Sequence, residues 1–204
     1  MRIAKLMALS LVLLIPAIGR AAPPPKSLAE IHAALAQDGD WIEVDRRGSV
    51  WSPHDVFFRP YSLGHWTVDG TVWTYHGANA ADDLTAHYGH WIDDPLYGWI
   101  WKPDGTWRPA AVAFRMGRSH VDWAPLDPDG NTSKNRADWV FVKGADAVAE
   151  KLEVVRLPPM ASIDLFDKTQ PLATPPTELA VLGLPEPSFL IDDERMAATE
   201  RTAM

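Results

Sequence analysis

The sequence predicts a mainly β fold, in which two related Trp-rich antiparallel modules form one small domain with a short helix before it and a flexible Pro-rich tail after it. Three observations support this prediction. All ten tryptophans lie between Trp41 and Trp139, similar residues recur at an offset near 50, and the segment 65–74 has the pattern of a β-hairpin. With 204 residues, of which 47% are hydrophobic, the chain is long enough to bury one core of ordinary size.

The N-terminus has the pattern of a secretion signal. Arg2 and Lys5 supply positive charge before an almost unbroken apolar run over 6–18, and Gly19 and Ala21 are small residues at the spacing that a signal peptidase reads. Retention of the run as an anchor is the alternative, but a membrane span needs about 20 residues. We therefore expect 1–21 to be a cleaved signal peptide, which leaves an exported protein, periplasmic or secreted, without a transmembrane span.

The composition excludes several classes of protein. The chain has no cysteine, so it has no disulfide framework, no thiolate metal site and no lipid-modified cysteine. Loss of the three basic residues of the signal changes the formal net charge from −8 to −11. Because so acidic a protein repels phosphate backbones and anionic membrane surfaces, we expect no nucleic-acid partner.

The region 22–37 is predicted to be a spacer followed by a short helix. Ser27 and Glu30 have the spacing of a capping box, and apolar residues recur after them at helical spacing. The helix should run from about 28 to 37, because Asp38-Gly39 ends the pattern.

An internal duplication is predicted over 38–143, with modules at about 38–87 and 88–143. Tryptophans, glycines and prolines of the two halves align at an offset near 50. The aligned pairs are Trp41 with Trp91, Gly48 with Gly98, Trp51 with Trp101, Pro53 with Pro103 and, after one deletion, Phe58-Arg-Pro60 with Trp107-Arg-Pro109. So many rare residues in register favour a duplicated unit.

The segment 65–74 predicts a β-hairpin. Strand-forming residues flank Asp69-Gly70, a pair that suits a two-residue type I′ turn. Such a turn places Trp66 directly opposite Trp73, with both indoles on one face of the hairpin.

The C-terminal third is predicted to be less regular. Residues 139–142 are expected to form a closing strand, and 144–157 a short helix or strand extension. The tail 158–204 contains seven prolines among isolated apolar residues with no sustained period. We expect this tail to be extended or disordered.

Ordered aromatic motifs resemble a known family. They include Gly48-Ser-Val-Trp-Ser-Pro53, Phe58-Arg-Pro-Tyr61, His87-Tyr-Gly-His-Trp91, Gly98-Trp-Ile-Trp-Lys-Pro103 and Asp122-Trp-Ala-Pro125. Over about 38–128 the chain resembles a family of Trp-rich bacterial exported proteins of unknown function. The resemblance implies export and a Trp-rich β architecture, and it implies no activity. Two departures are that 77–84 replaces an expected tryptophan-containing segment, and that Asp122 stands where the family pattern has glycine.

The tryptophans are the first candidates for a binding site, and two interpretations stay open. Flat indoles on an exposed β surface stack on sugar rings, whereas buried indoles are efficient core material because each removes about 150–250 Å² from water. The candidate ligand-binding residues are Trp66, Trp73, Trp51, Trp101 and Trp107.

We predict no catalytic residue, no metal site and no cofactor. The chain has no Gly-x-Ser-x-Gly elbow and no supported Ser-x-x-Lys pair. His87 and His90, with Asp93 and Asp94, form the densest group of possible ligands, but this spacing in turn and strand does not gather three or four of them. Adjacent acidic residues point to opposite faces of a strand, so no such pair makes a glycosidase site by itself.

We therefore expect an exported, non-catalytic cell-envelope protein that has a glycan-binding or structural role through its Trp-rich surface. Its expected partner is an envelope polysaccharide or another envelope protein. One alternative is an enzyme acting on envelope glycan, which requires a cleft with two convergent acids and at least one raised pKa. Another is a scaffold that recruits a protein through its Pro-rich tail. The sequence makes no prediction of the oligomeric state.

Overall fold

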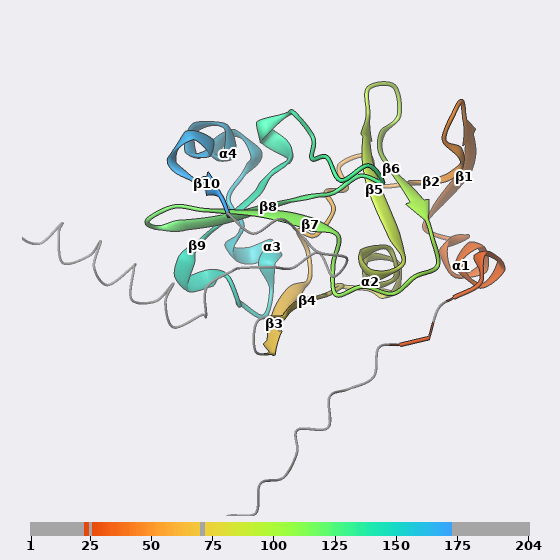
Figure 1. Ribbon diagram of the computed structural model, residues 1–204, viewed down its shortest axis with the longest axis horizontal. Coiled ribbons are helices and arrows are strands. Elements are labelled where there is room, and N and C mark those ends of the chain that lie inside the picture. The colour runs from red at the N-terminus through yellow and green to blue at the C-terminus, as the bar shows by residue number, and fades with distance from the viewer. Residues whose placement is uncertain (1–22, 25, 70–71, 173–204) are drawn as a thin grey trace, which may run out of the picture.

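The computed structural model describes residues 23–24, 26–69 and 72–172, and the statements below refer to these residues. The predicted signal peptide and the predicted tail from residue 173 onward lie outside them. The described chain is mainly antiparallel β, as predicted, with one four-stranded sheet in the order β1-β2-β6-β5, a second in the order β10-β7-β8-β9, and the separate hairpin β3-β4 (Figure 1).

The elements have the following bounds. The strands are β1 (Gly39–Val44), β2 (Gly48–Pro53), β3 (His65–Asp69), β4 (Val72–His76), β5 (Gly89–Asp94), β6 (Gly98–Pro103), β7 (Val112–Met116), β8 (His120–Pro125), β9 (Val140–Lys143) and β10 (Gln170–Pro171). The α-helices are α1 (Leu28–Leu35), α2 (Ala80–His87), α3 (Leu152–Val155) and α4 (Pro159–Leu165), and the 3-10 helices are η1 (Arg136–Asp138), η2 (Gly144–Asp146) and η3 (Phe166–Lys168).

The helix α1 begins as the sequence predicts. The Ser27 side chain accepts from the Glu30 backbone, and the Glu30 carboxylate accepts from the Ser27 backbone at 2.8 Å, so the capping box is complete. Ile31 and Leu35 are fully buried, which ties α1 to the main core. The predicted closing strand is also present, since β9 begins one residue after the predicted start.

The first sheet joins two helix–hairpin units with closely matched contacts. In one unit α1 precedes the hairpin β1–β2, and in the other α2 precedes β5–β6. The Trp51 indole donates to Leu35 O at 3.2 Å, and the Trp101 indole donates to Thr85 O at 2.9 Å. The hairpins meet where Trp51 pairs with Trp101 between β2 and β6. The two predicted modules therefore do not form separate sheets, because each contributes one hairpin to a shared sheet.

The predicted register of the hairpin β3–β4 is wrong by two residues. Trp66 pairs with Tyr75 and Val68 pairs with Trp73, so Trp66 and Trp73 are diagonal neighbours and not a direct pair. A shift of two residues preserves the face on which each side chain lies. The two indoles therefore still share one face, with ring centroids 6.4 Å apart in an edge-on arrangement.

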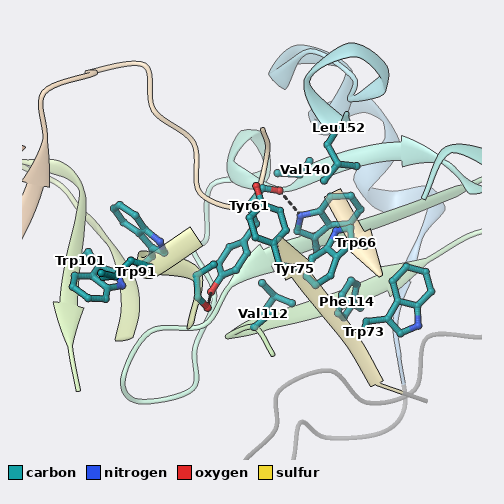
Figure 2. Packing of buried hydrophobic residues seen from close by; sticks show 14 of the residues in the cluster. Tyr61, Trp66, Trp73, Tyr75, Trp91, Trp101, Val112, Phe114, Val140 and Leu152 are labelled. Carbon is teal, nitrogen blue, oxygen red and sulfur yellow. Dashed lines mark hydrogen bonds between the residues drawn. The ribbon is translucent and has the colours of Figure 1, made fainter. Parts of the chain in front are cut away.

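This face of the hairpin lies at the centre of the main core. Figure 2 shows Trp66 among Tyr61, Tyr75 and Phe114, while Trp91 and Trp101 of the first sheet lie to one side. Seven of the ten tryptophans are at most 5% exposed, so indoles are the principal core material of this protein. They are Trp51, Trp66, Trp73, Trp91, Trp101, Trp123 and Trp139.

The segment 158–172 was predicted to belong to a disordered tail, and this prediction is wrong. The helix α4, the 3-10 helix η3 and the strand β10 pack on the second sheet, with β10 paired to β7 (Figure 1). Arg115 of β7 donates to Phe166 O at 2.9 Å and to Thr169 O at 2.5 Å. These contacts are long-range, so the proline content of the segment gave no signal of them.

Under this segment lies a buried ion pair that should make stability depend on pH. Asp122 of β8 is fully buried opposite Arg115, and its Oδ2 lies 3.5 Å from Arg115 Nε. Burial raises the pKa of Asp122 to about 7, although Thr169 and Arg115 act to lower it. Because the pKa is higher in the folded state, folding favours the protonated form. Stability is then greatest below the unfolded-state pKa of about 3.9 and falls as the pH rises through 7.

We expect the free energy of unfolding to fall by an amount on the order of a few kcal/mol between about pH 4 and pH 7.5 because of this one group. In Asp122→Asn this decrease of the free energy of unfolding with pH should disappear, since the amide does not ionise. Urea unfolding at a series of pH values measures it. Asp45→Asn is the matched control, because the Asp45 side chain is 98% exposed. An unchanged pH dependence of the free energy of unfolding in Asp122→Asn would contradict the assignment of this effect to Asp122.

Candidate functional site

A groove of about 810 Å³ lies between the β5–β6 hairpin and the loop that leads from β8 toward η1. We call it the β5 groove. This volume is within the range of about 300–1,000 Å³ typical of small-molecule sites. Its lining residues are Arg47, Trp91, Ile92, Asp93, Trp99, Ala113, Pro125, Leu126, Asp127, Gly130, Asn131, Thr132, Ser133 and Lys134.

The hairpin register places an acid and an indole next to each other in this groove. Asp93 of β5 pairs with Trp99 of β6, and Trp91 pairs with Trp101 two residues deeper. Directly opposed residues of an antiparallel pair project from the same face, so the Asp93 and Trp99 side chains are neighbours. Asp93 is exposed and Trp99 is only partly buried, whereas Trp91 is 2% exposed. Trp99 is thus the indole of this hairpin that a ligand in the groove can reach.

The opposite wall is the loop 127–134, which folds around the carboxylate of Asp127. Asp127 Oδ1 accepts from the backbone N–H groups of Asp129 and Asn131 at 2.9 and 2.8 Å. Gly130 takes a φ of +80°, a conformation that L side chains rarely adopt. These turn contacts give the loop a defined path and direct polar side chains along the groove.

A hydrogen-bonded cluster joins this loop to β5. The Ser133 hydroxyl oxygen lies 2.8 Å from Asp93 Oδ2 and 2.5 Å from Asp138 Oδ2, and it accepts from the Asn135 N–H at 3.0 Å. Burial is the main cause of a raised pKa for Asp138, and the nearby charge of Asp93 raises it further. Asp93, Ser133 and Asp138 therefore connect the two walls of the groove, and Asp93 and Ser133 also line it.

Both signs of charge occur in the β5 groove. Arg47 and Lys134 supply cations, and Asp93 and Asp127 supply carboxylates. Arg47 is partly engaged, with its Nε 3.7 Å from Asp94 Oδ2. The groove thus has no single dominant charge, which favours a polar ligand with little net charge or with charges of both signs.

The predicted ligand-binding tryptophans lie elsewhere, and four of the five are buried. Trp51, Trp66, Trp73 and Trp101 are at most 2% exposed, so none of them presents a ring face to a ligand. The prediction of an exposed stacking surface is wrong for these four, because their rings fill the core. The fifth, Trp107, is partly buried, stacks on His87 with centroids 5.3 Å apart, and is not among the groove-lining residues.

The sequence contained two signals of the groove that the prediction missed. Trp99 breaks the repeat, since the equivalent position in the first hairpin is Ser49. An indole that duplication does not require is a better candidate for binding than the indoles that recur. The segment 126–137 was also recognisable as a loop from its turn-forming residues. Its contact with β5 is long-range, however, and no local sequence pattern predicts it.

The two histidines considered as metal ligands have separate structural partners. The carbonyl oxygens of Arg108 and Leu126 only accept, so Nδ1 of His87 donates to the first at 2.7 Å and Nδ1 of His90 donates to the second at 3.1 Å. In the part of the chain that the structure describes, no group of three or more His, Asp and Glu side chains could hold a metal ion. In the same part, no helix has the length and apolar character needed to cross a membrane.

Comparison with known proteins gives one result. Residues 32–130 match the sequence model of a family described as "Family of unknown function (DUF6600)". The match covers just under half of the chain, includes β1 to β8 and ends inside the loop that forms a wall of the groove. No curated protein and no solved structure was found to match the chain.

Proposed function

We propose that this protein is exported to the bacterial cell envelope and binds a glycan chain in the β5 groove without catalysis. The observation that carries the proposal is the groove itself, in which an accessible indole stands beside hydroxyl, amide, carboxylate and cationic side chains. The pattern of the first 21 residues supports export, and the loss of their basic residues leaves an acidic protein that disfavours nucleic acid and anionic membranes.

A sugar polymer fits the chemistry of this lining. One face of a pyranose ring consists of C–H groups that pack on an indole such as Trp99, and its rim carries hydroxyls that both donate and accept hydrogen bonds. Asp127 and Thr132 offer acceptors, and Asn131 and Lys134 offer donors, along the opposite wall. The groove is not enclosed, which is compatible with binding of a segment of a chain.

Binding is favoured over glycan hydrolysis by the contact that both acids make with Ser133. The hydrolytic alternative needs two carboxyl groups about 5–9.5 Å apart on either side of the bond to be cleaved. Asp93 and Asp138 are two convergent acids, and the pKa of Asp138 is raised, but both carboxylates contact the same Ser133 oxygen. Because the hydroxyl occupies the space between them, they do not flank a sugar residue.

Fluorescence quenching tests the proposal. Most indoles are buried, so acrylamide should quench mainly Trp41, Trp99 and Trp107, which are partly exposed. We expect one polysaccharide from a panel of envelope glycans to protect a quenchable fraction of the emission. In Trp99→Phe that protected fraction should disappear, and the affinity should fall by about tenfold with the loss of one stacked indole.

Trp107→Phe is the matched control, because it removes an indole of similar exposure outside the groove. It should lower the total emission and leave the protected fraction and the affinity unchanged. If no glycan protects any emission, or if protection survives in Trp99→Phe, the proposed function is wrong.

A further inference from the structure

We propose that Asp93, Ser133 and Asp138 form a proton-dependent clasp that holds the loop 127–134 against β5 and thereby controls ligand binding in the β5 groove. The control of binding rests on the proposed function, whereas the clasp itself is a property of the free protein. Asp93 belongs to the β5 wall, and Ser133 and Asp138 belong to the loop and to η1 on the other side.

Counting protons shows why the clasp needs one carboxyl to be neutral. A serine hydroxyl has one hydrogen to donate and two lone pairs that accept. Ser133 Oγ accepts from the Asn135 N–H, and it lies within hydrogen-bond distance of an oxygen of Asp93 and an oxygen of Asp138. If both acids are ionised, the single hydroxyl hydrogen serves only one of them. The arrangement is fully satisfied when one carboxyl is protonated and donates to Ser133, while Ser133 donates to the other.

Electrostatics places that proton on Asp138. Asp138 is the more buried of the two acids, and burial together with the charge of Asp93 raises its pKa above the ordinary range for an aspartate. The hydrogen bond with Ser133 and, less strongly, the charge of Arg59 act to lower the pKa of Asp138, and burial outweighs them. Burial lowers the pKa of Arg59 to about 10, so it stays cationic near neutral pH.

Other charged groups face the same groove, and their effects have to be distinguished from the effect of the clasp. Arg47 and Lys134 line it from opposite sides, and Asp127 folds the loop through backbone contacts. His90, also on β5, donates to Leu126 O at the start of the loop. His90 is therefore the other titratable group that joins β5 to this segment, and the test has to distinguish it from Asp138.

The direction of the switch follows from the raised pKa. At acidic pH one proton is present and the clasp is closed, so the loop holds the position that forms the groove. As the pH rises through the pKa of Asp138, two like charges face one hydroxyl hydrogen, and repulsion releases the loop from β5. Ligand affinity in the groove therefore falls as the pH rises.

Hydrogen–deuterium exchange of the free protein tests the clasp without any ligand. Exchange of amides in 127–135, corrected for the intrinsic effect of pH, should be about tenfold faster at about pH 8 than at about pH 4, because one charge-assisted hydrogen bond is lost. Ser133→Ala should exchange fast at both pH values. Asp138→Asn should exchange slowly at both, since its amide supplies the donor permanently.

Asp129→Asn is the matched control, because it removes one charge from the same loop at an exposed position and should keep the wild-type response. Equal corrected exchange at both pH values in the wild-type protein would overturn the clasp. A pH response that survives in Asp138→Asn would also overturn it and would point to His90 or to the loss of global stability caused by ionisation of Asp122.

Quenching protection by the bound polysaccharide, measured at the same two pH values, tests control of binding. We expect about tenfold weaker binding at the higher pH in the wild-type protein and no such loss in Asp138→Asn. If hydrogen exchange of the loop changes with pH as expected while no glycan binds at either pH, the proposed function is rejected and the clasp is established. Glycan binding that does not change with pH while the loop switches would reject the control of binding.

Discussion

Replacing Trp66 with alanine is expected to destabilise the protein by about 3–5 kcal/mol, the usual cost of removing a large buried aromatic side chain. Trp66 is 2% exposed, and its ring lies 5.2 Å from that of Tyr75, 5.3 Å from that of Phe114 and 5.5 Å from that of Trp123, between centroids. The residual cavity would sit where these rings converge, and rigid aromatic neighbours have little freedom to fill it. Urea unfolding followed by fluorescence or circular dichroism measures the loss.

Two further substitutions make this result interpretable. Trp66→Phe keeps most of the buried ring and removes a buried indole N–H that makes no hydrogen bond within the described residues, so it should cost far less than alanine. Phe57→Ala should have almost no effect, because Phe57 is 90% exposed. A loss in Trp66→Ala no greater than in Phe57→Ala would show that the hairpin β3–β4 does not lie at the centre of the core.

Gly89→Ala is expected to have the second largest effect, at least about 3 kcal/mol of destabilisation, because a strand would have to move. A β-carbon on Gly89 would lie 2.3 Å from Lys102 O and 2.6 Å from Trp101 Cζ2. Gly39 occupies the matching place in the other hairpin, where a β-carbon would lie 2.3 Å from Ser52 O and 2.5 Å from Trp51 Cε2. Gly39→Ala should therefore have a similar cost in urea unfolding.

Gly98→Ala is the control for backbone conformation. Gly98 has a φ of +70°, but an added β-carbon there meets no atom within 4 Å. Its substitution should cost only the roughly 1–2 kcal/mol of a left-handed non-glycine residue. Equal losses in Gly89→Ala and Gly98→Ala would mean that close packing of the indole on the strand is not what requires glycine at position 89.

The sequence predicted those parts of the fold that depend on neighbouring residues. The capping box fixed the start of α1, and alternation around Gly70 identified the hairpin although its register was two residues off. The register of the hairpin depends on which two residues form the turn. Turns at Asp69-Gly70 and at Gly70-Thr71 give registers that differ by two residues. Both are compatible with the alternation of the side chains, because a shift of two residues leaves each side chain on the same face of the hairpin. The tryptophan count predicted an aromatic domain and did not reveal which rings face outward.

The candidate site was less predictable because none of its contacts is local. Asp93 meets Ser133 and Asp138 only after the chain has passed through three further strands. Each residue alone resembles an ordinary solvated loop or strand residue. The same holds for 158–172, where the anchor is Arg115 on a distant strand and the proline content pointed to disorder.

The family match ends within the loop that forms one wall of the β5 groove, so it includes only part of the groove lining. Residues 32–130 contain Trp99 and Asp93, whereas Ser133, Asp138 and β9 follow the end of the match. The β5 groove of this chain therefore takes its accessible indole and the Asp93 carboxylate from the matched region, and Asn131, Thr132, Ser133 and Lys134 from the segment that follows it.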